Sequence, residues 1–177
     1  MNPQELVARG FSPEWAVFLT SMIPVVELRG ALPLAINLFK IPWPRAFLIS
    51  FLGNILPVPF ILYFLKPITN ILSRLILFKR FFDWLFTRTR RKSAMIEKYE
   101  EVGLMLFVAI PLPGTGAWTG ALLAYLLDLD YKKALFYIAL GVFMAGIIVT
   151  SLCLMGWIGA IIAGCGILLF SLLRILK

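Results

Sequence analysis

The chain has 177 residues, a length typical of one domain. With 61% apolar residues, 15% charged residues and a mean hydropathy of +0.93, its composition excludes an ordinary soluble domain and indicates an integral membrane protein. The net charge of +8 is concentrated in segment 79–92 beside hydrophobic segments, which favours contact with anionic lipids over a nucleic-acid partner.

The first apolar stretch covers residues 15–39 and is interrupted near its middle. The interruption contains three residues that a continuous helix disfavours: Pro24, Gly30 and Pro33. It also contains Glu27 and Arg29, whose charges are costly in hydrocarbon. Residues two positions apart lie on different sides of a helix. We therefore expect this pair in a non-helical tip or with separate partners.

Residues 47–65 carry no charge and are long enough for one membrane span. They follow a loop predicted at residues 40–45. Pro57 and Pro59 predict a kink, and Lys66-Pro67 predicts the end of the helix. Asn54 is a polar group that needs a partner within the bundle.

Residues 68–86 show a helical period of apolar residues with a polar stripe. This pattern predicts an amphipathic helix in the membrane interface, held by anionic lipids. A solvated linker helix is the alternative. A short polar stretch, residues 93–101, leads from it to the second interrupted stretch.

The second interrupted stretch covers residues 103–127. Its interruption is rich in proline and glycine: Pro111, Pro113, Gly114, Gly116 and Gly120. As helices, segments 104–110 and 117–127 would be roughly 10 and 16 Å long, each about half of a bilayer core. The stretch is therefore either one kinked crossing or a re-entrant hairpin.

The distribution of charge favours the hairpin for this second stretch. Residues 128–133 are predicted to be a loop, and the uncharged residues 134–173 two spans joined by a turn at 151–156. If segment 79–92 is cytoplasmic, a hairpin keeps Lys132 and Lys133 inside, whereas a single crossing would place them outside. The charges near the first stretch are too balanced to decide in the same way.

An internal repeat suggests that both stretches have the same structure. Segment 45–53 resembles segment 133–141 at an offset of 88 positions, and each follows a proline-containing break at nearly the same distance. The predicted topology runs the two copies in opposite directions across the membrane. Inverted repeats of this kind, with broken helices that meet at the midplane, are common in secondary transporters.

Several residue types that carry chemistry are missing. The chain has no histidine, the commonest metal ligand and proton shuttle. Cys153 and Cys165 do not have the spacing of a metal site. We therefore expect no metal and no other cofactor. Without an acidic cluster or a Gly-x-Ser-x-Gly motif, the chain is not expected to be an enzyme and no catalytic residue is predicted.

Three motifs lie in and near the two breaks: Glu27-Leu-Arg-Gly-Ala-Leu-Pro33, Leu52-Gly-Asn54 with Pro57-Val-Pro59, and Pro111-Leu-Pro-Gly-Thr-Gly-Ala-Trp-Thr-Gly120. Together they resemble the small multidrug export protein family, which is itself similar to the DedA/VTT membrane proteins. The resemblance implies two opposed re-entrant hairpins with transmembrane helices, and a role in transport or lipid scrambling. The additional acidic and arginine residues of the DedA pattern are absent from residues 104–127, which carry no charge.

The predicted fold is an all-α integral membrane fold. It has two opposed re-entrant helical hairpins in an inverted repeat, about three transmembrane helices and one interfacial amphipathic helix. Residues 1–177 form a single membrane domain. Its first half-repeat covers residues 1–65, the amphipathic helix and basic linker 66–102, and the second half-repeat 103–177.

The predicted site lies where the two breaks meet. Arg29 suits a phosphate or a carboxylate, and the backbone N–H groups at the start of the second half-helix favour an anion. The predicted substrate- or ion-binding residues are Glu27, Arg29, Gly30, Pro33, Asn54, Pro111, Pro113, Gly114, Thr115, Gly116, Trp118 and Thr119. The alternative is that Glu27 and Arg29 only staple the tip as an ion pair, and that the glycines allow close helix packing.

The leading functional hypothesis is a secondary transporter or flippase for an amphiphilic, anionic, lipid-phosphate-like substrate, with proton coupling through Glu27. The alternatives are proton-coupled export of cationic drugs, which Arg29 would repel, and a non-transporting membrane scaffold. Expected partners are membrane lipids, the small amphiphilic substrate, protons and a second copy of the chain in a homodimer. The expected location is the plasma membrane of a prokaryote, multi-pass, with segment 79–92 and the C-terminus cytoplasmic.

Overall fold

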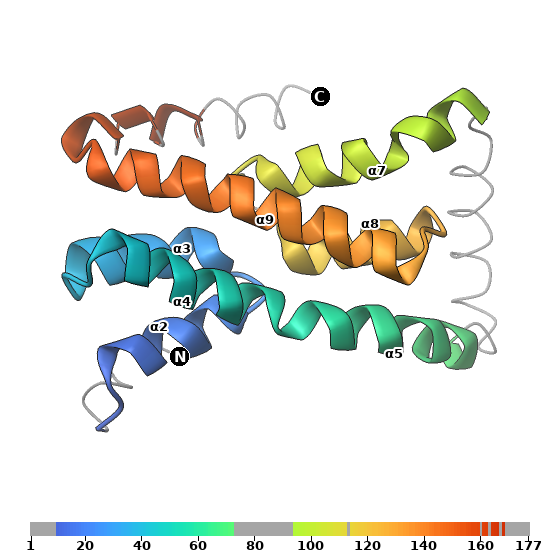
Figure 1. Cartoon of the computed structure of the whole chain (residues 1–177), viewed down its shortest axis with the longest axis horizontal. Helices are drawn as coiled ribbons and strands as arrows, with labels where there is room; N and C mark the ends of the chain where they lie inside the picture. Colours follow the sequence, from blue (N-terminus) through green and yellow to red (C-terminus); the bar gives the residue numbers. More distant parts are fainter. Residues whose placement is uncertain are drawn as a thin grey trace.

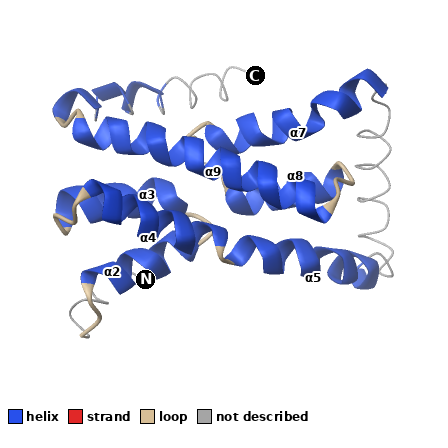
Figure 2. Cartoon of the chain, viewed as in Figure 1, coloured by secondary structure: helices blue, strands red, loops and turns tan. Residues whose placement is uncertain are grey.

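The computed structural model describes residues 10–72, 94–112, 114–159, 161–162, 164–166 and 168, apart from the side chains of residues 66–72 and 94–98. Every element among them is helical (Figure 2). The basic segment 79–92, most of the predicted amphipathic helix at 68–86, Pro113 and residues 169–177 lie outside the described part of the chain.

The first half of the chain opens with a pair of helices joined by a short break. In α2 (Pro13–Met22), the side chain of Ser12 caps the helix by accepting a hydrogen bond from the Trp15 N–H at 3.4 Å. After residues 23–26 the chain continues in α3 (Glu27–Pro33), which packs against α2 and runs into the π-helical η1 (Leu34–Leu38). The predicted interruption of the first apolar stretch is confirmed.

A long helical segment follows. It consists of α4 (Trp43–Ile55) and α5 (Pro57–Leu72). The two are interrupted at Leu56, because Pro57 lacks the N–H group that would continue the helical series of backbone hydrogen bonds. Two details of the prediction are wrong. The expected loop at 40–45 ends earlier, since Pro44 is tolerated in the first turn of α4. The helix also continues through Pro67, because a proline removes one hydrogen bond but does not have to end a helix.

The second half contains α7 (Ala94–Ala109), α8 (Ala117–Leu126), α9 (Tyr131–Leu154) and a further apolar helix at Trp157–Gly166. The predicted break between half-helices and the turn within 151–156 are confirmed. Residues 94–101 of the predicted polar stretch are helical and belong to α7. The loop predicted at 128–133 ends at Asp130, whose side chain caps α9 by accepting from the Lys132 N–H at 3.1 Å.

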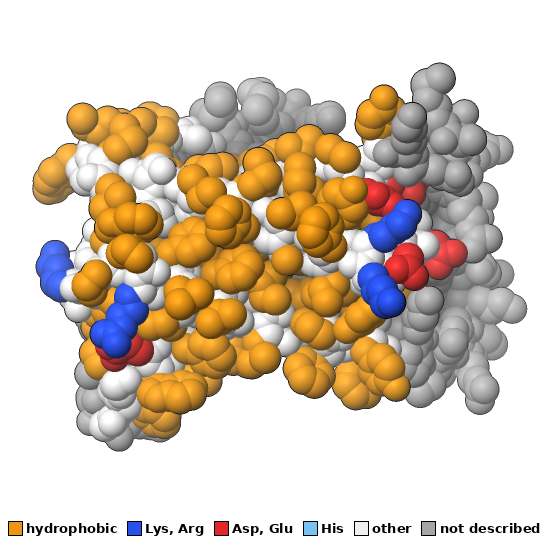
Figure 3. Space-filling view, viewed as in Figure 1, with side chains coloured by type: hydrophobic (Ala, Val, Ile, Leu, Met, Phe, Trp, Pro, Cys, Tyr) orange, Lys and Arg blue, Asp and Glu red, His pale blue; other side chains and the backbone are white. Residues whose placement is uncertain are grey.

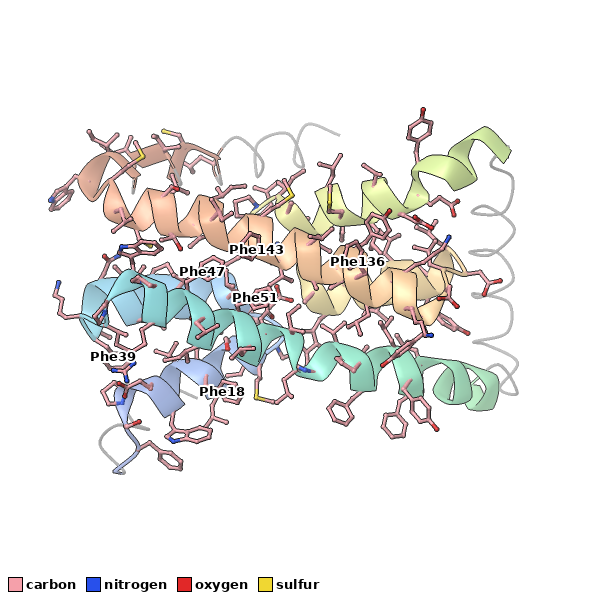
Figure 4. All side chains as sticks on the ribbon, viewed as in Figure 1. Phe18, Phe39, Phe47, Phe51, Phe136 and Phe143 are labelled. Atoms are coloured by element: carbon pink, nitrogen blue, oxygen red, sulfur yellow. The ribbon has the colours of Figure 1, made fainter. Side chains whose placement is uncertain are left out.

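The two pairs of short helices point toward each other (Figure 1). From the centre of the molecule, α2 and α3 extend toward one end and α7 and α8 toward the other, while α4–α5 and α9 run along the whole length. We call the α2–α3 pair the first hairpin and the α7–α8 pair the second hairpin. Phe47 and Phe51 of α4 pack edge-on against Phe143 of α9, with ring centroids 5.4 and 6.1 Å apart (Figure 4).

The same order of elements occurs twice, at an offset of 88 positions. α4 begins at Trp43 and α9 at Tyr131. Before these starts, the chain leaves the preceding helix through Lys40 in one half and Asp128 in the other, which have φ angles of 54° and 55°. Two non-glycine residues, 88 positions apart, thus adopt the same uncommon conformation just before a long helix.

Two helical segments are long and apolar enough to cross a membrane: Trp43–Leu65 and Tyr131–Leu154. The helix at Trp157–Gly166 is shorter, so two of the three predicted spans are found among the described residues. On the face in Figure 3, charged side chains gather at the two ends of the molecule and hydrophobic side chains cover the part between them. This distribution is that of a protein embedded in lipid.

Candidate functional site

The tips of the two hairpins meet at a cavity of about 730 Å³. One side is formed by the break of the first hairpin and the start of α3, and another by residues 110–112, 114 and 116 of the second hairpin. The end of α9 and the helix at Trp157–Gly166 complete the lining with mostly apolar side chains. The cavity therefore joins a few polar groups at the tips to a large apolar wall.

Glu27 lies at the start of α3, with only 4% of its surface exposed and a left-handed φ of 50°. This backbone conformation costs a non-glycine residue on the order of 1–3 kcal/mol. It directs the carboxylate across to the second hairpin, where Oε1 accepts a hydrogen bond from the Trp118 N–H at 3.2 Å. The carboxylate thus sits at the N-terminus of α8, the helix end that favours negative charge.

Gly116 provides the room for this carboxylate. A Cβ atom at this position would overlap the carboxylate of Glu27, and the φ of −87° is one that any residue can adopt. A side chain at position 116 is therefore excluded by the contact with Glu27 and not by backbone strain. The glycine of the predicted motif has a specific function in the fold, which is to let a charged side chain reach the end of α8.

Arg29 binds the complementary helix end. Its Nη1 donates to Oε2 of Glu27 at 2.6 Å. Its Nη2 lies 2.9 Å from the carbonyl oxygen of Val108 and 3.1 Å from that of Ile110, at the C-terminal end of α7. It also lies 3.1 Å from the carbonyl oxygen of Thr115, which precedes α8. Carbonyl groups at a helix C-terminus favour positive charge. The prediction that the pair lies in a non-helical tip is wrong, because Glu27 and Arg29 both lie in the first turn of α3. The alternative holds in part: each has its own partners on the second hairpin, but the two side chains also pair with each other.

Other predicted residues hold the two tips in place. The indole N–H of Trp118 donates to the Met22 carbonyl oxygen at 3.1 Å and so joins α8 to the end of α2. The hydroxyl of Thr115 lies 2.7 Å from the Ile110 carbonyl oxygen and closes the turn of the second tip. The hydroxyl of Thr119 donates to the Gly116 carbonyl oxygen at 3.1 Å. These contacts make the meeting point of the hairpins a continuous hydrogen-bonded unit.

Most of the predicted site residues line the cavity: Glu27, Arg29, Gly30, Pro33, Pro111, Gly114, Gly116 and Thr119. Thr115 contributes through its contacts with Arg29, and Trp118 through its N–H. Asn54 is buried in α4, away from this lining, and its Oδ1 has no hydrogen-bond partner among the described residues. The structure therefore does not bring Asn54 to the site.

The sequence analysis missed the apolar part of the cavity and one polar residue. Ile148, Leu152 and Cys153 at the end of α9, and Ile162 beyond it, line the wall opposite the tips. Nothing in an uninterrupted apolar run distinguishes these side chains from lipid-facing ones. Asn37 also lines the cavity, and a polar residue within the first apolar stretch was a signal that could have been used.

Comparison with known families identifies the chain. A family model described as "Putative small multi-drug export protein" matches residues 27–148, more than two thirds of the chain. The matched region begins at Glu27 and includes both halves of the contact between the hairpins. No curated protein and no solved structure gives a significant match. The chain therefore belongs to the small multi-drug export protein family, a family named for membrane transport.

Proposed function

We propose that this protein is a secondary transporter or flippase for an amphiphilic substrate with an anionic, phosphate-like head, with proton coupling through Glu27. The observation that carries the proposal is the composition of the cavity. Its charged groups, Glu27 and Arg29, lie together at the hairpin tips, and its remaining wall is largely apolar. A cavity of this kind matches a molecule with one charged end and one apolar end.

The anionic head of the substrate is supported by the groups at the tips. The guanidinium of Arg29 is held in one place by the carbonyl oxygens of Val108 and Thr115, so it presents a fixed positive charge to the cavity. The N-terminus of α8 adds backbone N–H groups from the other side.

The apolar end of the substrate is supported by the wall formed by Ile148, Leu152 and Ile162. These side chains come from α9 and from the helix beyond Gly156, a residue that has a φ of 58° and open space around it. An alkyl chain that leaves water for such a wall would gain about 0.8 kcal/mol for each methylene that it buries. The length of the tail is therefore expected to affect affinity strongly.

The membrane arrangement is part of the proposal. We place the two hairpins as re-entrant hairpins that enter from opposite faces and form an inverted repeat, so that the cavity lies near the midplane. Their opposed directions in Figure 1 and the repeated order of elements support this arrangement. Segment 79–92 and the C-terminus are cytoplasmic in a prokaryotic plasma membrane, and a second copy in a homodimer helps to enclose the pathway.

Export of cationic drugs is the second candidate function, because the family description names multi-drug export. A cation would need the carboxylate of Glu27, which is already paired with Arg29 at 2.6 Å. A cationic substrate would also approach the fixed charge of Arg29. These contacts favour the anionic substrate. A membrane scaffold without transport is the third candidate, and it would not need the cavity at all.

The test uses the purified full chain in proteoliposomes that contain NBD-labelled phosphatidic acid. Dithionite added outside destroys the label that the protein brings to the outer leaflet, so the rate of loss measures flipping. We expect wild-type protein to accelerate this loss. Arg29→Lys should reduce the rate by about tenfold or more, since one ammonium nitrogen replaces the two guanidinium nitrogens that bind Glu27 and the carbonyl oxygens separately, and a charged hydrogen bond is lost.

The control variant is Arg45→Lys, which changes an exposed arginine whose nearest Nη lies 3.8 Å from Glu14. It should flip the lipid at the wild-type rate. Efflux of ethidium with no flipping of phosphatidic acid would favour the cationic-drug candidate. No flux of either probe by a folded wild-type protein would contradict a transporter and favour the scaffold.

A further inference from the structure

The anion-binding end of α8 is already occupied by a group of the chain itself. The carboxylate of Glu27 accepts the Trp118 N–H at 3.2 Å, fills the space left by Gly116 and pairs with Nη1 of Arg29. These are the donors that the proposed function assigns to the substrate head. A substrate anion and the Glu27 carboxylate cannot both use them.

We infer that Glu27 is a resident anion that the substrate displaces, and that each anion bound is accompanied by one proton taken up by Glu27. The inference rests on the proposed function and specifies how its site is regulated. The ligand class is an oxyanion, either the head group of an amphiphile or free phosphate. The proton comes from the aqueous phase and binds the carboxylate when it leaves α8.

Displacement is possible because of the position of Glu27. Its side chain borders the cavity of about 730 Å³, which provides space into which the carboxyl group can turn. Its φ of 50° is an uncommon conformation that persists only while the surrounding contacts hold it. Loss of the Trp118 and Arg29 contacts removes what holds this conformation, so the residue has a second state available to it.

Protonation follows from the charges around the displaced carboxyl group. The titratable groups among the described lining residues are Glu27, Arg29 and the thiol of Cys153 at the end of α9. From the second hairpin, the described groups that contact Glu27 are not titratable: the backbone N–H of Trp118 and Gly116, which has no side chain. Arg29 therefore has one positive charge to share between two anions. Two neighbouring anions with one cation disfavour the second negative charge, and a proton removes it.

A pH dependence follows by linkage. If one proton binds with each anion, affinity for the anion rises as pH falls, by about tenfold per pH unit while Glu27 is charged in the unliganded protein. A binding site made by Arg29 alone, with Glu27 as a bystander, would show no such dependence for a ligand whose own charge is constant. Proton uptake on binding thus distinguishes displacement of Glu27 from binding of the anion to Arg29 alone.

The experiment is titration calorimetry of the full chain in a neutral detergent, with dodecyl phosphate and inorganic phosphate as separate probes. Each titration is repeated in two buffers of different ionisation enthalpy, which gives the number of protons taken up per ligand after correction for the ligand's own titration. We expect about one proton per anion for the wild type. Glu27→Gln should bind without proton uptake and with affinity independent of pH.

Two further variants keep the test decisive. Glu14→Gln is the matched control, a carboxyl group outside the site that should retain wild-type proton uptake. Glu27→Asp keeps the charge and is better tolerated at positive φ, but it is shorter, so it should hold α8 less well and bind the probe more tightly with uptake retained. This variant answers the question even where Glu27→Gln does not fold.

The outcomes separate the inference from the proposed function. Binding to the wild type without proton uptake, or uptake unchanged in Glu27→Gln, contradicts displacement and leaves the proposed anionic substrate in place. No binding of either phosphate contradicts both. Uptake with dodecyl phosphate alone supports displacement by an amphiphile, and uptake with both probes supports displacement by the oxyanion itself.

Discussion

At the scale of single residues, Glu27 and Arg29 act as caps of two helices that belong to the opposite hairpin. Glu27 lies at the positive N-terminus of α8 and Arg29 at the negative C-terminus of α7. Each charge thus has both its ionic partner and a helix end of opposite sign. This arrangement explains how two charges are tolerated at the centre of an apolar molecule.

The cap on α8 can be tested with Gly116→Ala. Its Cβ would overlap the Glu27 carboxylate and force it away from the Trp118 N–H. Loss of such a cap should lower the free energy of unfolding by about 1–2 kcal/mol, which thermal unfolding in detergent would show as a lower Tm. Gly103→Ala, an exposed helical position with open space, is the control and should be neutral or stabilising. An unchanged Tm for Gly116→Ala would mean that the cap contributes little.

At the scale of elements, α4 contacts α2 and α9 contacts α7 in the same two ways. Arg45 pairs with Glu14 and Lys133 with Glu101, the latter at 2.7 Å. Eight residues further along each helix, a glycine lets the backbone of the hairpin helix approach. A Cβ at Gly53 would lie 2.5 Å from the Phe18 carbonyl oxygen, and one at Gly141 would lie 2.7 Å from that of Met105.

These contacts give the repeat detected between segments 45–53 and 133–141 a physical meaning. The first residue of each segment carries a positive charge for an ion pair, and the last is a glycine at a close helix crossing. Apart from Ser50, the intervening residues are apolar in both copies and match easily by chance. What the two halves share is therefore the way in which a hairpin is attached to a long helix.

Gly141→Ala tests the close crossing of α7 and α9. The new methyl group meets a backbone carbonyl and the side chain of Val108, neither of which is the free end of a flexible side chain. Overpacking of this kind should lower the free energy of unfolding by about 1–3 kcal/mol. Thermal unfolding would measure the effect, and Gly103→Ala on α7 again serves as the control. Equal Tm values for the two variants would show that the helices separate easily at this point.

At the scale of the whole molecule, the two ends carry the charged side chains and the part between them is apolar (Figure 3). The ion pair Glu14–Arg45 lies toward one end and Glu101–Lys133 toward the other, in agreement with the opposed directions of the hairpins. In the proposed topology these ends face opposite sides of the membrane.

This topology predicts which positions are reached from outside the cell. In a background with Cys153→Ser and Cys165→Ser, Pro44→Cys should react with a membrane-impermeant maleimide on intact cells. Lys132→Cys should react only after permeabilisation. Both positions are exposed and lie in the first turn of their helices, so they are matched controls for each other. Labelling of both from the same side would contradict the inverted arrangement.

Prediction from the sequence succeeded for features that depend only on neighbouring residues in the chain. The breaks at both tips, the kink before Pro57 and the turn within 151–156 follow from proline, glycine and hydrophobic length. It was less accurate at helix ends, where Pro44 and Asp130 each begin a helix in a segment rich in loop-forming residues. Such residues favour both loops and first turns, and the sequence pattern does not separate the two.

The sequence by itself determined that the protein is a membrane protein with two proline- and glycine-rich interruptions, because bulk hydropathy and backbone chemistry depend on residue type alone. It also identified Glu27 and Arg29 as the charges of interest. Only the tertiary structure decided what they contact, since the ends of α7 and α8 lie about eighty to ninety positions away in the chain. It also separated Asn54 from the cavity and added the apolar wall beyond Ile148. Contacts of this kind depend on how the hairpins pack, which no local pattern records.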